Sequence, residues 1–209
     1  MTLLRKAEHQ ALSRISLSGD VLDLGGEKRS KYALQIATEA RVTTVNISPE
    51  LGADIVANLE ESLPIPDNSY DHALLMNVLE HVFEYRLLLG ECARVVRPGG
   101  SIVIVVPYLF PYHASPSDFH RYSKEALVRA LTSAGFSDIE VSPLGSGVFS
   151  AQWLFLERLL PGRIQDLLAP ITHSTVQGAD VLFTALARRL RKKYDPADYA
   201  LGFCATAKL

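Results

Sequence analysis

Between residues 20 and 139, short runs of apolar residues alternate with longer stretches in which apolar residues recur every three or four positions. Short apolar runs are typical of strands in parallel sheets, and the longer periods are typical of the helices that connect them. The pattern therefore predicts an α/β fold with a mostly parallel sheet. The predicted strands cover residues 21–24, 42–47, 54–56, 72–76, 102–106, 136–141 and 199–208.

The predicted helices carry recognisable start and stop signals. Residues 1–15 mix charged and apolar side chains at the spacing of an amphipathic helix. A helix over residues 85–96 ends at the segment Arg97-Pro98-Gly99-Gly100, because proline and glycine do not continue a helix. Ser123 is typical of an N-cap and predicts a helix that ends at Gly135. Further helices are predicted over residues 151–160, 165–168 and 181–192.

The length of 209 residues suits one domain with a large buried core and is short for two. We expect an N-terminal helix within residues 1–18 and a ligand-binding core over residues 19–142. Residues 143–209 are expected to hold a helical insertion and the closing strand. The chain is thus interpreted as a single domain.

Composition excludes several classes of function. Lys and Arg number 21 against 23 Asp and Glu, a net charge of −2, so the chain lacks the positive excess of a dedicated nucleic-acid binder. Cys92 and Cys204 are far apart and form no zinc-ligand pattern, which indicates no metal site and a reducing, cytoplasmic environment. No apolar run reaches the ~18–20 residues of a membrane-spanning helix.

The first predicted strand leads directly into Asp23-Leu24-Gly25-Gly26. Glycines in this turn let backbone pass close to a ligand at the carboxyl edge of the sheet. A dinucleotide fingerprint needs a third glycine shortly afterwards, and none follows before Gly52. With Asp23 and no phosphate cradle, the turn suits a ligand that is cationic and carries no phosphates. S-adenosylmethionine, with its sulfonium and ammonium groups, is such a ligand.

Four segments, taken in order, resemble the motifs of the class I S-adenosylmethionine-dependent methyltransferases, and in particular the type 11 branch. Residues 21–26 resemble the first glycine motif, 63–71 the "LPFPDNSFD" run, 77–82 the "VLEHV" run, and 91–100 the "E-x-x-R-V-L-K-P-G-G" run. The resemblance covers roughly residues 21–139 and, weakly, the closing strand. It implies a Rossmann-like, doubly wound sheet of seven strands, mostly parallel with an antiparallel last strand, and a helical insertion before that strand.

The resemblance also assigns cofactor-binding residues. It implies that Asp23, Gly25 and Gly26 lie by the methionine part of the cofactor. Asn46 takes the place of the acid that usually accepts the ribose hydroxyls, so charge assistance is lost there. The remaining implied cofactor contacts are Asn58 and Leu59 near the adenine, and Asn77 and His81 after the fourth strand.

The loop over residues 107–123 resembles the "P-x-x-x-x-x-H-x-x-P-x-D-x-x-R-Y-T" stretch of methyltransferases associated with cell-surface glycan and lipid synthesis. His113 and His120 are candidate general bases, because imidazole titrates near neutral pH, and Asp118 is a candidate orienting group. Candidate substrate-binding residues are Tyr112, Arg121 and Tyr122. The alternative is a loop whose polar residues serve only its shape. A metal bound by the two histidines and Asp118 is conceivable on ligand type, but no spacing supports it.

The sequence thus favours a methyltransferase that uses S-adenosylmethionine on a small molecule or on a glycan or lipid precursor. Glu27, where the family usually has a further glycine, and Asn46 motivate the alternative of a non-catalytic Rossmann-like binding or scaffold protein. A nicotinamide-dependent oxidoreductase is disfavoured by the missing glycines. The basic run at residues 188–193 could contact anionic lipid, although such runs are more often solvated helix ends. The sequence gives no indication of oligomeric state.

Overall fold

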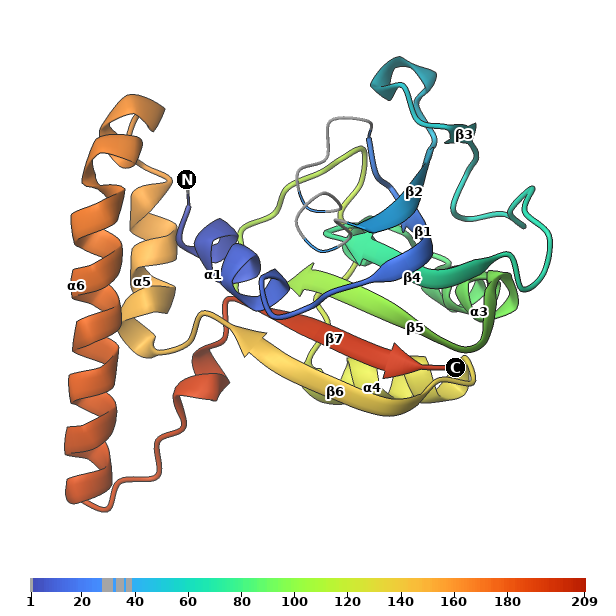
Figure 1. Ribbon diagram of the computed structural model, residues 1–209. Coiled ribbons are helices and arrows are strands. Elements are labelled where there is room, and N and C mark those ends of the chain that lie inside the picture. Colours follow the sequence, from blue (N-terminus) through green and yellow to red (C-terminus); the bar gives the residue numbers. More distant parts are fainter. Residues whose placement is uncertain (1, 28–31, 33–35, 37–38) are drawn as a thin grey trace.

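The computed structural model describes residues 2–27, 32, 36 and 39–209. These residues form a seven-stranded sheet in the order β3-β2-β1-β4-β5-β7-β6 (Figure 1). The strands are β1 (Ser18–Leu24), β2 (Glu39–Asn46), β3 (Ile55–Val56), β4 (Tyr70–Met76), β5 (Val96–Pro107), β6 (Ser137–Leu144) and β7 (Gly202–Lys208). Neighbouring strands from β3 to β5 are parallel, whereas β7 is antiparallel to both β5 and β6. The predicted doubly wound sheet with an antiparallel last strand is confirmed.

The sheet is buried on both faces. In β5, Ile102, Ile104 and Val106 belong to one hydrophobic cluster, whereas Val103 and Val105 belong to another. Helices α3 (Tyr85–Val95) and α4 (Lys124–Ser133) contribute to the first cluster, and α1 (Leu3–Leu12) and α5 (Val148–Glu157) contribute to the second. Because consecutive side chains of a strand point to opposite faces, a strand covered on both faces is apolar throughout.

Helix α4 begins as the sequence predicts, because the Ser123 side chain accepts a hydrogen bond from the Ala126 backbone N–H. Helix α3 likewise ends at Val95, close to the predicted stop. The Arg97-Pro98-Gly99-Gly100 segment then falls within the range of β5, which begins earlier than predicted. The pairing of β4 with β5 shifts register there, as expected where an irregular segment enters a strand.

The C-terminal helices differ from the prediction. Residues predicted to form two separate helices belong to one long helix, α6 (Gly162–Arg189), with Pro170 inside it. Ala169, His173 and Asp180 are buried. They form an inward-facing stripe along residues 169–180, which lie between the two predicted helices. A proline removes one backbone hydrogen bond, and packing along this stripe outweighs that loss.

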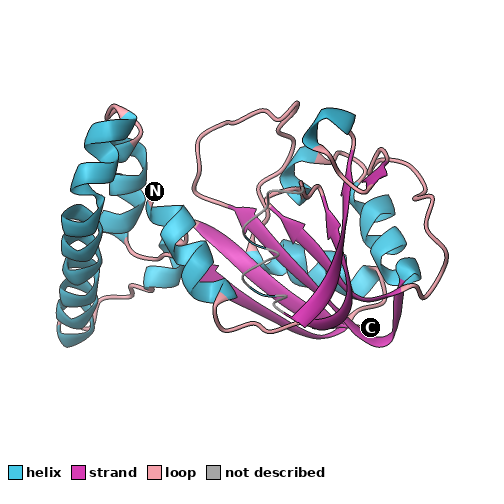
Figure 2. Ribbon diagram, turned by 45° about the horizontal axis from the view of Figure 1, so that its top comes forward, coloured by secondary structure: helices cyan, strands magenta, loops and turns pink. Residues whose placement is uncertain are grey.

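Helices α5 and α6 lie side by side and stand beyond α1, on the side of the sheet where the parallel strands end (Figures 1 and 2). The buried Glu157 carboxylate joins the three helices, because it accepts hydrogen bonds from the Leu3 backbone N–H at 3.0 Å and from His173 Nε2 at 3.1 Å. None of the helices formed by the described residues is long and apolar enough to cross a bilayer.

Candidate functional site

Three adjoining cavities open where the parallel strands β1, β2 and β4 end. The first, about 610 Å³, is lined by Asp23 and the two glycines that follow β1. The second, about 450 Å³, lies against Asn46 and the residues after β3. The third, about 270 Å³, lies between α1 and the loop after β5. Asn77 and Ser115 line all three cavities, so the cavities meet at these residues.

The turn after β1 can be built only with glycine. Gly25 has a φ of +82°, a left-handed conformation that side chains disfavour, and a Cβ there would lie 2.4 Å from Val78. A Cβ on Gly26 would lie 2.3 Å from Asp23 Oδ2. The bare backbone therefore forms a cradle directly beside the Asp23 carboxylate.

Asp23 lies at the floor of the first cavity and is 1% exposed. Its Oδ2 atom has no hydrogen-bond partner among the described residues. Burial raises the pKa of the Asp23 carboxyl to about 7. A buried acceptor without a donor is costly, so the site is suited to a ligand that brings a cationic donor.

The predicted contacts to the ribose and the adenine lie in the second cavity, but their polar groups already have protein partners. Asn46 Nδ2 donates to the carbonyl oxygens of Gly25 and Gly26, and its Oδ1 accepts from the Ser48 backbone N–H. Asn46 therefore braces the glycine turn, with one acceptor position of Oδ1 left for a hydroxyl.

Asn58 closes its own loop, because it donates to Glu61 and accepts from the Glu60 backbone N–H. The neighbouring Leu59 side chain is 8% exposed and supplies an apolar wall to the same cavity. A polar loop beside an apolar wall is compatible with a flat heteroaromatic ring. The assignment of Asn58 and Leu59 as adenine contacts stays a prediction.

Asn77 follows β4 in a left-handed conformation, with a φ of +56°. Its side-chain amide donates to Glu8 Oε1 at 3.1 Å, and Glu8 Oε2 accepts from the Tyr32 hydroxyl at 2.7 Å. Glu8 is 2% exposed, and burial raises the pKa of its carboxyl. Glu8 is not among the site residues predicted from the sequence. It lies four residues after Leu4 and four before Leu12, so it is on the apolar face of its helix.

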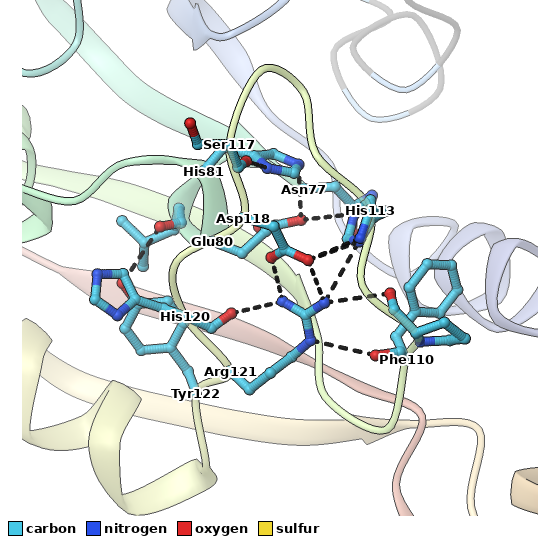
Figure 3. A network of polar contacts seen from close by, with 12 residues as sticks. Asn77, Glu80, His81, Phe110, His113, Ser117, Asp118, His120, Arg121 and Tyr122 are labelled. Atoms are coloured by element: carbon cyan, nitrogen blue, oxygen red, sulfur yellow. Dashed lines mark hydrogen bonds and ion pairs between the residues drawn. The ribbon is translucent and has the colours of Figure 1, made fainter.

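The loop after β5 is organised around one ion pair (Figure 3). Arg121 contacts both oxygens of Asp118, at 2.5 and 2.6 Å, and also donates to the carbonyl oxygens of Phe110, Pro111 and His120. The guanidinium group holds the pKa of Asp118 at about 2. Arg121 thus uses its donors inside the loop and holds the loop's shape, and its role in substrate binding stays a prediction that this arrangement does not favour.

His113 is held by the same ion pair. The Asp118 Oδ2 atom accepts from the His113 backbone N–H at 2.9 Å and lies 3.4 Å from His113 Nδ1. Burial lowers the pKa of His113, so its ring is neutral at pH 7 and can accept a proton. His113 lines the third cavity together with His81. The predicted pairing of His113 with Asp118 is present in the structure.

Directly below these two histidines lies Glu80, which the sequence analysis treated only as part of a motif. Its side chain is fully buried, and its Oε1 atom lies 3.7 Å from His81 Nε2 and 3.8 Å from His113 Nε2. Burial raises the pKa of the Glu80 carboxyl to about 8. His81 itself ends a short 3₁₀ helix, η2 (Leu79–His81), where a longer helix was expected to start.

His120 is turned away from His113 and lies on the other side of the loop (Figure 3). Its ring packs among Phe83, Tyr85 and Tyr122, outside the three cavities. Tyr122 is 5% exposed, and its hydroxyl donates to the Leu79 carbonyl oxygen. Both rings thus belong to an aromatic cluster outside the three cavities, and the catalytic role of His120 and the substrate contact of Tyr122 stay predictions that this placement does not favour.

Tyr112 is 76% exposed, and its role as a substrate contact stays a prediction. Both cysteines are buried, as predicted for core residues. Burial raises the pKa of the Cys204 thiol to about 11 and also raises that of Cys92, so neither is a nucleophile at neutral pH.

Comparison with known proteins agrees with this geometry. Residues 22–104 match a family model described as "Methyltransferase domain". A "Probable S-adenosylmethionine-dependent methyltransferase" of Mycobacterium tuberculosis is 31% identical over 97 residues, which make up 44% of this chain and 35% of that protein. A demethylmenaquinone methyltransferase of Tropheryma whipplei is 29% identical over 102 residues, covering 43% of this chain and 42% of that protein. The matched region thus spans less than half the length of either relative.

The fold comparison extends over nearly the whole chain. The crystal structure of a SAM-dependent methyltransferase from Archaeoglobus fulgidus matches with a TM-score of 0.60 and 16% identity, covering 98% of this chain and 94% of that one. Strand order, the glycine turn and the family match over residues 22–104 agree with one another. Residues 22–104 are therefore similar to the methyltransferase domain family, and the fold of the chain is that of the solved S-adenosylmethionine-dependent methyltransferases.

Proposed function

We propose that the protein transfers a methyl group from S-adenosylmethionine to a small molecule or to a glycan or lipid precursor. The observation that carries this proposal is the buried Asp23 Oδ2 atom, which has no partner among the described residues and faces a cradle of bare glycine backbone. The bound cofactor would supply an activated methyl group on a cationic sulfonium, a good leaving group. The acceptor therefore needs chiefly to be positioned.

Different residues would contact different parts of the cofactor and the acceptor. Asp23 would accept hydrogen bonds from the cationic end of the cofactor, and Gly25 and Gly26 would let it approach the backbone. The second cavity would hold the nucleoside, with Asn46 and Leu59 at its walls. Because the third cavity meets the other two at Asn77 and Ser115, an acceptor bound there would reach the junction.

For a hydroxyl acceptor, a base must also remove a proton. His113 is neutral at pH 7, lines the third cavity and is oriented through Nδ1 by Asp118. In the tautomer that carries the proton on Nδ1, beside this carboxylate, the Nε2 lone pair is available to take a proton or to bind a cation. His113 is therefore the candidate base, and His120 is not.

A finer proposal concerns the acceptor. Helix α6 carries an exposed apolar stripe that includes Leu167, Ile171 and Leu182, which are 76%, 69% and 72% exposed. The basic run at residues 188–193 follows at the end of the same helix. Apolar area beside clustered positive charge is typical of helices that bind anionic lipid surfaces. We infer that this helix pair contacts an anionic membrane surface, which would deliver a lipid-linked acceptor.

The proposal is tested by calorimetric titration with S-adenosylmethionine and S-adenosylhomocysteine. We expect binding of both, and an affinity at least about tenfold lower for Asp23→Asn, which keeps the shape but loses the charge. Asp20→Asn is the matched control, because Asp20 lies at the opposite end of the same strand. No binding by the folded wild-type protein would contradict the proposal and favour a non-catalytic scaffold. Equal losses in both variants would contradict the placement of the pocket.

A further inference from the structure

Glu80, His81 and His113 bring three metal-ligating side chains together at the junction of the cavities. One ligand atom from each lies within 4.8 Å of the others. The Glu80 carboxylate is fully buried, and neither of its oxygens has a hydrogen-bond partner among the described residues. A buried carboxylate left in this state indicates that a positively charged partner belongs beside it.

The tautomer of His81 directs a free lone pair toward Glu80, and one tautomer of His113 does the same. His81 Nδ1 lies 2.5 Å from the Ser117 carbonyl oxygen, and a carbonyl only accepts, so Nδ1 carries the proton. His113 Nδ1 lies 3.4 Å from the Asp118 carboxylate, which also only accepts. In His81 the Nε2 atom is therefore unprotonated and lies 3.7 Å from Glu80 Oε1, and His113 Nε2 lies 3.8 Å from the same oxygen.

Arg121 also lies 3.5 Å from His113 Nδ1, which would favour the other tautomer. That contact is at the limit of hydrogen bonding, and the same Arg121 nitrogen lies 2.6 Å from Asp118 Oδ2. His113 Nδ1 thus has an arginine donor and a carboxylate acceptor within 3.5 Å, and a cation bound at Nε2 would select the tautomer in which Nδ1 carries the proton and faces Asp118.

This arrangement is how proteins support metal ligands. A ligating histidine almost always donates its other N–H to a backbone carbonyl or a carboxylate, which fixes the ring and makes Nε2 more basic. His81 has the first kind of partner, and His113 has the second. Ligand atoms around a tetrahedral ion are roughly 3.4 Å apart. The observed 3.7 and 3.8 Å separations are close to that value.

We propose that Glu80, His81 and His113 bind a divalent first-row transition-metal ion. Two imidazoles and one carboxylate favour such an ion over Mg²⁺ or Ca²⁺, which prefer oxygen ligands. Because both histidines line the third cavity, the remaining coordination positions face the space assigned to the acceptor. The role of the ion rests on the proposed methyl transfer: it would bind an acceptor oxygen and lower the pKa of that hydroxyl, so that the proton is lost to solvent and His113 acts as a ligand in place of a base.

The site is distinct from the set of ligands that the sequence made conceivable. His120 is not part of it, since its ring lies in the aromatic cluster on the other side of the loop. Asp118 contributes through His113, because both its oxygens are held by Arg121. Glu80, unassigned from the sequence, supplies the carboxylate.

Metal binding is tested on the chelator-treated protein by titration with Zn²⁺, Mn²⁺ and, under anaerobic conditions, Fe²⁺. We expect one ion per chain, and a loss of affinity exceeding about a hundredfold in Glu80→Gln and His113→Ala. His120→Ala is the matched control, since it removes a histidine of the same loop without touching the three ligands. Titration with Co²⁺ adds visible absorption bands that report coordination by nitrogen and oxygen.

No ion bound by the folded wild-type protein would overturn the proposal, as would equal losses in His113→Ala and His120→Ala. Thermal melts of each variant show whether it is folded. Should Glu80→Gln fail to fold, His81→Ala addresses the same site from η2. Titration of the same samples with S-adenosylhomocysteine separates the two proposals. Cofactor binding without metal binding would leave the methyltransferase proposal standing alone, and metal binding without cofactor binding would do the reverse.

Discussion

At the scale of single residues, two acidic side chains beside the cavities are buried although some of their carboxylate oxygens accept no hydrogen bond from the described residues. Asp23 has one oxygen with no partner among the described residues, and Glu80 has two. Elsewhere buried acids are satisfied: Glu157 accepts hydrogen bonds from the backbone of α1 and from His173. Unsatisfied buried acceptors are rare in folded proteins because each one is destabilising. Asp23 lines the first cavity, and Glu80 lies within 3.8 Å of both histidines that line the third, so both acids are placed to receive cationic partners.

The pKa of Asp23 makes cofactor binding dependent on pH. With a pKa of about 7, the carboxyl is mostly neutral at pH 6 and mostly ionised at pH 8. The affinity for S-adenosylmethionine should therefore rise by roughly tenfold between these two pH values. Calorimetry across this range measures the change. Asp23→Asn should lose this dependence, and an unchanged slope in that variant would contradict the assignment.

Without ligand, the same carboxyl has the opposite effect on folding. The folded state binds a proton that the unfolded state loses near pH 4, so this group contributes less stability as pH rises from about 4 through about 7. Cofactor affinity and the stability of the free protein thus change in opposite directions over this window. This opposition is typical of a group placed for its ligand.

At the scale of elements, two of the sequence motifs serve to fasten segments together. Arg94 of α3 donates to Glu91 and to Asp67, and also to the carbonyl oxygens of Leu63 and Ile65. The arginine thus joins the "E-x-x-R-V" motif to the "LPFPDNSFD"-like segment. The arrangement holds the pKa of Glu91 at about 2. These motifs identify the family through its framework, away from the reacting groups.

A second fastening joins the C-terminal helices. Asp180 of α6 is 5% exposed and accepts hydrogen bonds from the backbone N–H groups of Phe149 and Ser150 and from the Ser150 hydroxyl. It therefore caps the N-terminus of α5 from a neighbouring helix, where the helix dipole also favours negative charge.

Asp180→Asn should lower the free energy of unfolding by about 2 kcal/mol, because an amide offers one acceptor where the carboxylate used two. Urea unfolding followed by circular dichroism gives the value. Glu140→Gln, at an exposed position of β6, is the control and should change the stability by less than about 0.5 kcal/mol. A similar small effect at both positions would show that the cap contributes little.

At the scale of the whole molecule, the helix pair α5–α6 stands apart from the sheet (Figure 2). Several of its apolar side chains are exposed to solvent. Large exposed apolar areas mark surfaces that bind something. A basic run at one end distinguishes this surface from a purely apolar one, and it favours an anionic bilayer over a second copy of the chain.

We expect the protein to sediment with vesicles that contain anionic lipid and to stay in solution with neutral vesicles. Replacing Arg188, Arg189, Lys192 and Lys193 with serine should reduce binding by roughly a thousandfold, since each basic residue near the surface contributes roughly 1 kcal/mol. Arg129→Ser, an exposed position on α4, should leave binding unchanged. A stable dimer in solution that is dissociated by Leu182→Glu, together with no vesicle binding, would show that a second copy covers this face.

Much of the fold could be predicted because apolar periodicity is a local property. The run at residues 102–106 is a strand covered on both faces, and Ser123 is an N-cap, as expected. The continuity of α6 could not be predicted, since Pro170 and the polar residues after it conceal a stripe that only packing against α5 reveals.

The site was predicted less completely because its residues are joined by tertiary contacts. His113 and Asp118 pair as expected, whereas Arg121 is used inside the loop, and no spacing rule shows that in advance. Glu8 reaches Asn77 from a helix 69 positions earlier in the chain. The pattern showed an acid on an apolar helix face, but its partner depends on where that helix docks.

The docking of α1 also sets the two chain ends apart. Thr2 lines the third cavity, while Leu209 forms backbone hydrogen bonds with Gly99 and Gly100 at the amino end of β5, on the far side of the sheet (Figure 1). A purification tag or fluorescent label added before residue 1 would therefore start beside the acceptor space. One added after Leu209 would start well away from it, and this is the end to modify when binding and turnover are measured.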